Sequence, residues 1–86
     1  MDDETLKVYG YVISSSYREK SVKSLEKSDK IPTDLADDIG IRINHISKVL
    51  KELKDTGVIV CVNEEKRKNR LYKLTPKGEK IAKHID

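Results

Sequence analysis

The most constraining feature of the sequence is an amphipathic segment, residues 42–56, that passes through a glycine directly into a β-branched run. At 100° per residue, its larger apolar side chains fall within about 100° of one another. These side chains are Ile46, Val49, Leu50 and Leu53. The pattern predicts a helix from Arg42 to about Thr56, and Gly57 is suited to the left-handed conformation that ends a helix. The run over 58–62 predicts a strand, because β-branched residues favour extended backbone.

A second strand and a final helix are predicted after that run. Residues 63–69 form a polar, basic turn, and residues 70–74 alternate apolar and polar side chains as a returning strand does. Thr75 and Pro76 are suited to the cap and the first position of a helix. The apolar seam of that helix consists of Ile81 and Ile85.

A helix over 17–27 is predicted from a capping box. In this box the Ser16 hydroxyl accepts a hydrogen bond from the Glu19 amide, while the carboxylate reaches back to the Ser16 amide. The larger apolar residues of this helix are Tyr17, Val22 and Leu25. Two serines lie on or near the same face, so the helix buries little by itself.

A short helix is predicted between this element and the amphipathic segment. Residues 31–32 form an extended connector, because the residue before a proline avoids the helical region. Thr33 is suited to the N-cap of a helix over 34–39, and Gly40 is suited to the turn that follows.

The basic charge is concentrated in two stretches. The 86-residue chain, short enough for one domain, has 18 basic and 15 acidic residues and a formal net charge of +3. Residues 41–54 hold four basic residues and one acidic residue, and residues 63–73 hold five basic and two acidic residues. Locally dense positive charge attracts a polyanion, although a basic run is often only a solvated surface.

Three segments, read together, resemble a winged helix-turn-helix. The sequence LADDIGI at 35–41 is similar to the helix-turn-helix signature, in which Ala36 lets two helices approach closely and Gly40 takes the turn conformation. LKDTGVI at 53–59 and RLYKLTPKG at 70–78 are similar to the remainder of a winged-helix regulator of the MarR and ArsR superfamily, and to small archaeal winged-helix proteins. The resemblance covers the chain from about residue 14 onward.

The resemblance implies a mainly α fold with a small β-hairpin wing (α+β), built on a three-helix core plus a C-terminal helix. The winged-helix domain is expected over 16–86, after an N-terminal extension over 1–15 that is helical or extended. Within the domain, the implied parts are the helix-turn-helix at 33–56, the wing at 58–74 and the C-terminal helix at 75–85.

The resemblance also implies double-stranded DNA as a partner. A major groove about 12 Å wide admits one α-helix, and the amphipathic segment is expected to be the recognition helix. The residues of that helix expected to contact DNA are Arg42, Asn44, His45, Ser47, Lys48 and Lys51. The wing is expected to follow the backbone or enter the minor groove through Lys66, Arg67, Lys68 and Arg70. Thr33, at a helix start, is expected to hold a further phosphate.

Three residues allow more than one interpretation. Ile43 either contacts a thymine methyl or packs under the wing, and we favour packing. His45 either contacts a phosphate or is half-buried. Cys61, within a run of valines, is expected to be a small core residue, with a redox switch as the alternative.

The leading hypothesis is a sequence-specific DNA-binding transcriptional regulator that forms a homodimer. Apolar residues in 6–13 recur at helical spacing, although every second residue from Tyr9 to Ile13 also fits a strand, and we favour a helix. Because these residues, with Ile81 and Ile85, exceed what a thin core needs, we expect the dimer seam to lie there. The alternatives are a winged-helix module for protein contacts and an architectural protein that binds DNA without sequence preference.

Several other classes are not expected. One cysteine excludes an intrachain disulfide and a cysteine zinc cage, and it fits a reducing, cytoplasmic compartment. No apolar run approaches the roughly 18 residues of a membrane helix, and no signal peptide opens the chain. The sequence shows no enzymatic motif, metal-ligand spacing, cofactor motif or small-molecule site.

Overall fold

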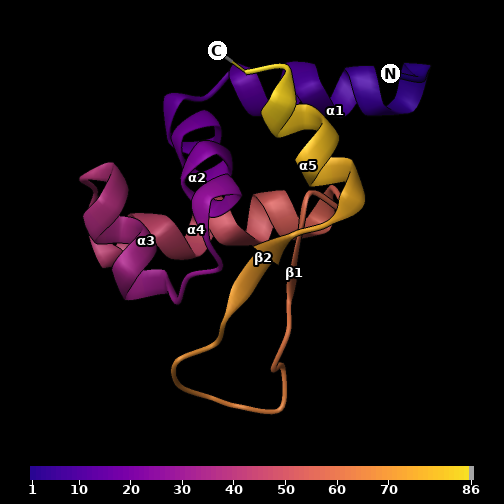
Figure 1. The fold of residues 1–86 in the computed structure, drawn as a ribbon. Coiled ribbons are helices and arrows are strands. Elements are labelled where there is room, and N and C mark those ends of the chain that lie inside the picture. The colour runs from indigo at the N-terminus through magenta and orange to yellow at the C-terminus, as the bar shows by residue number, and fades with distance from the viewer. Residues whose placement is uncertain (86) are drawn as a thin grey trace.

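A computed structural model describes residues 1–85 and contains five helices and a two-stranded antiparallel hairpin (Figure 1). The helices are α1 (Asp3–Ile13), α2 (Ser16–Lys27), α3 (Pro32–Ile39), α4 (Ile43–Asp55) and α5 (Pro76–Lys83). The strands are β1 (Ile59–Cys61) and β2 (Tyr72–Leu74). This order confirms the predicted architecture of helices followed by a hairpin wing and a last helix. The loop between the strands extends away from the helices (Figure 1).

Helix α4 buries the predicted apolar stripe. All four stripe residues are at most 4% exposed: Ile46, Val49, Leu50 and Leu53. The helix starts one residue later than predicted, because Arg42 has extended backbone and is the N-cap, without a side-chain hydrogen bond. Gly40 and Gly57 have φ of 76° and 78°, which confirms the left-handed conformation expected at both turns.

The hairpin is shorter than predicted, but its register is regular. Ile59 pairs with Leu74, and Cys61 pairs with Tyr72. Backbone hydrogen bonds continue past both strand ends, since the Thr75 amide donates to the Val58 carbonyl at 3.0 Å. The inward side chains of β1 and β2 are buried, and Cys61 is 6% exposed, which confirms its predicted place in the core.

The caps of α2 and α3 differ from the prediction. Ser15, rather than Ser16, is the N-cap of α2, and its hydroxyl accepts from the Arg18 amide at 3.3 Å. Three consecutive serines can each cap a helix, so the sequence alone did not fix which one does. Thr33 is not an N-cap, because the chain already turns helical at Pro32 and Ile31 takes the cap position.

The ambiguous N-terminal segment is helical, which confirms the favoured prediction for 6–13. Asp2 caps α1 by accepting from the Thr5 amide at 2.7 Å. Helix α1 lies beside α5, where the Tyr9 hydroxyl donates to the His84 carbonyl at 3.2 Å (Figure 1). Helix α5 starts as predicted, with Thr75 accepting from the Gly78 amide.

The core corrects the predicted dimer seam. Ile81 is fully buried and Ile85 is 6% exposed in the single chain, so neither residue offers a surface to a second copy. The seam of α5 is instead covered by the chain's own helices and hairpin. Tyr17 also differs from the expectation that it belongs to the buried face of α2, because it is 40% exposed. Ser21 and Ser24 are buried, as expected for residues on that face.

Candidate nucleic-acid interface

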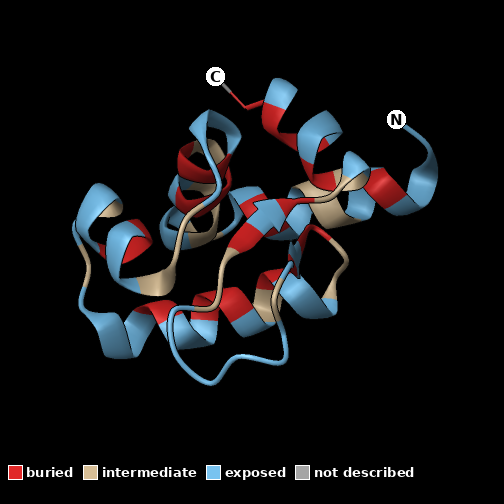
Figure 2. Ribbon diagram, turned by 60° about the horizontal axis from the view of Figure 1, so that its bottom comes forward, coloured by how far each residue is buried: buried red, intermediate tan, exposed pale blue. Residues whose placement is uncertain are grey.

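The exposed side of α4 lies opposite the core stripe, as Figure 2 shows along the helix. The exposed polar residues on this helix and at its cap include Arg42, Asn44, His45, Ser47, Lys48 and Lys51. The structure therefore places all six predicted recognition-helix residues at the surface of one element. Lys51 donates to Asp55 at 3.1 Å, but these side chains are 76% and 63% exposed, so water weakens the ion pair.

For two residues at the start of α4, the structure excludes one of the two interpretations. Ile43 is 51% exposed and does not pack under the wing. His45 is exposed rather than half-buried, and its ring centroid lies 6.1 Å from that of Tyr17 in a tilted arrangement. Both side chains are therefore open to a partner.

Of the four basic wing residues predicted to contact DNA, three are exposed and the fourth has a structural role. Lys66, Arg67 and Lys68 are exposed in the loop between the strands (Figure 2). Arg70 is partly buried, and it donates from Nε to the Lys66 carbonyl at 2.7 Å and from Nη2 to the Glu64 carbonyl at 3.2 Å. The Arg70 guanidinium is thus aimed at the loop's own backbone.

Asn63 is a second residue that shapes the wing, and the sequence analysis did not single it out. Its Oδ1 accepts from the Leu71 amide at 2.7 Å, and its Nδ2 donates to the Asn69 carbonyl at 3.2 Å. Asn69 has a φ of 56°, a left-handed conformation that asparagine tolerates better than most residues. An asparagine at each end of a polar loop was the available signal, since this residue type commonly bonds to nearby backbone in turns.

An ion pair joins α4 to the wing. Lys54 Nζ donates to the Glu64 carboxylate, although both side chains are about half exposed. The hydrogen bond from Lys54 lowers the pKa of Glu64, and the same bond raises the pKa of Lys54. The pair holds the loop against the C-terminal half of the helix.

A groove of about 330 Å³ lies between the start of α3, the exposed side of α4 and the base of the wing. Its lining residues are Pro32, Ser47, Leu50, Lys51, Lys54, Asp55 and Tyr72. Thr33 is exposed in the first turn of α3, next in sequence to Pro32 at the rim of the groove. Residues from three elements therefore meet along one surface.

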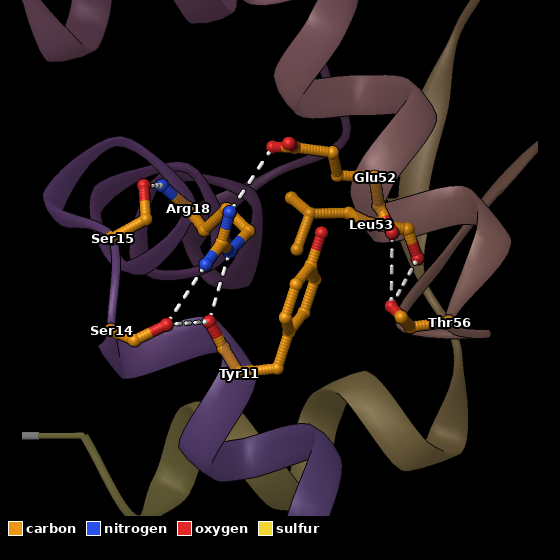
Figure 3. A network of polar contacts seen from close by, with 7 residues as sticks. All are labelled: Tyr11, Ser14, Ser15, Arg18, Glu52, Leu53 and Thr56. Carbon is orange, nitrogen blue, oxygen red and sulfur yellow. Dashed lines mark hydrogen bonds and ion pairs between the residues drawn. The ribbon is translucent and has the colours of Figure 1, made fainter.

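A polar network holds α2 against α1 and reaches Glu52 on α4 (Figure 3). Arg18 donates from Nε to the Tyr11 carbonyl and from Nη2 to the Ser14 hydroxyl, both at 2.9 Å. Its guanidinium carbon lies 3.8 Å from the centroid of the Tyr11 ring, which is a cation–π geometry.

In residues 1–85, no three His, Cys, Asp or Glu side chains are grouped so that they could hold a metal ion. None of the helices described is long and apolar enough to cross a bilayer.

The sequence matches no protein-family model and no curated protein sequence, but its fold matches several solved structures. The adhesin competence repressor AdcR from Streptococcus pyogenes has a TM-score of 0.75 at 19% identity, over 83% of this chain and 54% of that chain. A ZitR mutant from Lactococcus lactis has a TM-score of 0.72 at 23% identity, over 80% of this chain and 48% of that chain. A MarR family transcription regulator has a TM-score of 0.66 at 24% identity, over 78% of this chain and 46% of that chain.

These matches show that the chain has the winged-helix fold of MarR-family regulators over most of its length. The chain spans about half the length of these solved structures. At identities below 25%, these structural matches establish the fold alone. The function has to be argued from the chain's own surface.

Proposed function

We propose that the protein is a cytoplasmic, sequence-specific DNA-binding transcription regulator that inserts α4 into the major groove. The observation that carries this proposal is that the polar, basic side of α4 lies next to a basic wing tied to the same helix by Lys54 and Glu64. The fold supports it, because the solved structures that match include an adhesin competence repressor and a MarR family transcription regulator. A helix in the groove with a wing beside it satisfies both base readout and backbone contact.

The exposed residues of α4 have chemistry suited to base edges. Asn44 can pair through two hydrogen bonds with adenine N6 and N7, and Arg42 or Lys48 can donate to guanine O6 and N7. The Ser47 hydroxyl can donate a hydrogen bond to a base edge or accept one from it. Lys51, one turn beyond Ser47, can contact a phosphate. His45 can contact a phosphate at the other side of the helix.

The wing and the start of α3 supply the sequence-independent contacts in this proposal. Lys66, Arg67 and Lys68 carry positive charge to the backbone or the adjacent minor groove, where Lys or Arg also responds to groove width. Thr33 can hold one more phosphate at the helix start. Arg70 supports these contacts from behind by fixing the loop.

We further propose a homodimer, with α1 as its seam. Leu6 and Ile13 are 53% and 41% exposed and lie two turns apart on this helix. Gly10 lies between them, and a Cβ at that position would meet no atom within 4 Å, so a second helix could approach closely. Two copies on two half-sites would about double the specific contact energy. A monomer in sedimentation at tens of micromolar would contradict the seam.

Selection of duplexes from a random pool, at two salt concentrations, tests the proposed function. The protein is expected to recover one motif, with a steep loss of affinity as salt rises. The variant N44A/K48A is expected to lose the preference at one or two positions, at about 1–3 kcal/mol for each bidentate contact removed. The matched control K83A removes a lysine from the exposed side of α5 and is expected to keep the motif.

Two other results would replace the proposal. Salt-sensitive binding without a motif would identify an architectural DNA binder. No binding at physiological salt would identify a module for protein contacts.

A further inference from the structure

The first residue of α4 is an exposed isoleucine within a polar surface. Ile43 is 51% exposed, and its sequence neighbours Arg42 and Asn44 are exposed as well. Ile43 is not part of the hydrophobic core, nor one of the partly buried apolar residues packed against it. The position of Ile43 on the helix, rather than its exposure alone, indicates what it can contact.

Ile43 belongs to the row of residues that faces the groove. Ser47 and Lys51 follow it at intervals of four residues, so the three side chains lie one above the other along α4. Ser47 and Lys51 both line the groove between α3, α4 and the wing. Ile43 therefore continues this row at the N-terminal end of the helix, the end that contacts base edges in helix-turn-helix complexes.

The charge around Ile43 favours DNA as the partner over an apolar protein surface. Arg42 and Lys48 are exposed on the same helix, and the wing adds an exposed basic tip. A nucleic acid offers one apolar group to a helix in the major groove, which is the 5-methyl group of thymine. An isoleucine in this row matches that group, whereas it has no donor or acceptor for any other base edge.

We infer that Ile43 is a specificity-determining residue that contacts a thymine methyl in the DNA bound by α4. This inference rests on the proposed function. Burial of one methyl group against Ile43 predicts about a fourfold gain in affinity for thymine over a base without the methyl. If only the backbone of α4 or only Asn44 contacted this base, affinity would not differ between thymine and a base without the methyl group.

Replacement of thymine by deoxyuridine tests the inference, because it removes only the methyl group. In the motif recovered by selection, each thymine is replaced in turn, and affinity is measured for the wild type, I43A and the control K83A. The wild type and K83A are expected to bind about fourfold more weakly when one particular thymine is replaced. I43A is expected to bind the duplex with that thymine and the duplex with deoxyuridine in its place with equal affinity. Thermal melting is expected to show that I43A stays folded.

The outcomes separate this inference from the proposed function. A recovered motif with no deoxyuridine effect in the wild type overturns the role of Ile43 and leaves the proposed function standing. A deoxyuridine effect that persists unchanged in I43A also overturns it, because another residue then makes the contact. Failure to recover any motif overturns the proposed function, and the inference with it.

Discussion

Arg18 on α2 donates a hydrogen bond from Nη1 to Oε1 of Glu52 on α4 at 3.2 Å. Only 12% of the Arg18 side chain and 26% of the Glu52 side chain are exposed. The same guanidinium bonds to α1 (Figure 3), so one side chain joins three helices and sets how α4 lies on its support.

We expect R18A to lower the free energy of unfolding by about 1.5–3 kcal/mol, because it removes charge-assisted hydrogen bonds from a partly buried carboxylate. The variant R18K keeps the charge but loses the planar fork, so it should recover only part of the loss. Urea denaturation of R18A, E52Q and the double variant measures the coupling. Additive effects of the two single changes would contradict a direct interaction.

The contact between α5 and the turn before β1 has no room for a side chain. A Cβ on Gly78 would lie 2.1 Å from the Val58 carbonyl oxygen and 3.2 Å from Leu74 Cδ2. We expect G78A to destabilise the protein by about 1–3 kcal/mol, since either backbone has to move. Thermal or urea denaturation measures this loss.

Gly10 supplies the matched control, because a Cβ there meets no atom within 4 Å and the residue lies inside α1. We expect G10A to stabilise the monomer by about 0.5–1 kcal/mol, because alanine favours the helical backbone more than glycine does. Dilute protein, in which the copies do not associate, isolates this effect. Equal changes in the free energy of unfolding of G78A and G10A would show that the backbone around Gly78 can move to make room for a Cβ.

The ion pair between Lys54 and Glu64 predicts a pH window for the attachment of the wing. The Glu64 pKa is lowered from 4.5 in the folded protein, so its contribution is present above pH 4.5 and is lost as pH falls through the lowered value. The Lys54 pKa is raised from 10.5, so its contribution is present below pH 10.5 and is lost as pH rises through the raised value. The pair is therefore intact between these limits.

Nuclear magnetic resonance of the wing amides checks this window. The differences in chemical shift between the wild type and E64Q should be largest near neutral pH and should vanish in acid, once Glu64 is protonated. The control E65Q changes an exposed neighbour and should show no such pH dependence. Differences that persist after Glu64 has titrated would contradict the prediction.

Arg70 and Lys68 are expected to affect DNA binding in different ways. K68A removes an exposed charge and should reduce the slope of log affinity against log salt by about 0.9, with no change in the wing. R70A removes the donor to the Lys66 and Glu64 carbonyls, so it should also speed hydrogen exchange in the loop. Exchange rates that are equal in the two variants would show that Arg70 is an ordinary surface charge.

Local patterns predicted most of the fold. The stripe from Ile46 to Leu53 repeats with the period of a helix, and the two glycines that follow the helices meet a conformational need that few residues satisfy. Such signals depend on residues that are near one another in the sequence, so they can be interpreted without knowledge of the tertiary structure.

The predictions from the sequence were wrong where the exposure or role of a side chain depends on packing between elements that are distant in the sequence. Ile43 and Ile81 are both isoleucines on amphipathic helices, yet one is 51% exposed and the other fully buried. The difference is the side of the helix on which each residue lies. Ile81 faces the core, where α5 packs against α1, α2 and β2, whereas Ile43 lies on the exposed side of α4. The role of Arg70 was hidden for the same reason, since its acceptors are carbonyl groups that have no sequence signature.

The wing loop is folded on itself through hydrogen bonds between its backbone and the side chains of Asn63 and Arg70. Fixing a residue's backbone costs about 1–2 kcal/mol of conformational entropy, and this loop has met that cost during folding. A partner that binds the wing therefore meets a preformed shape. Its association is limited by diffusion and orientation, with no folding step to slow it.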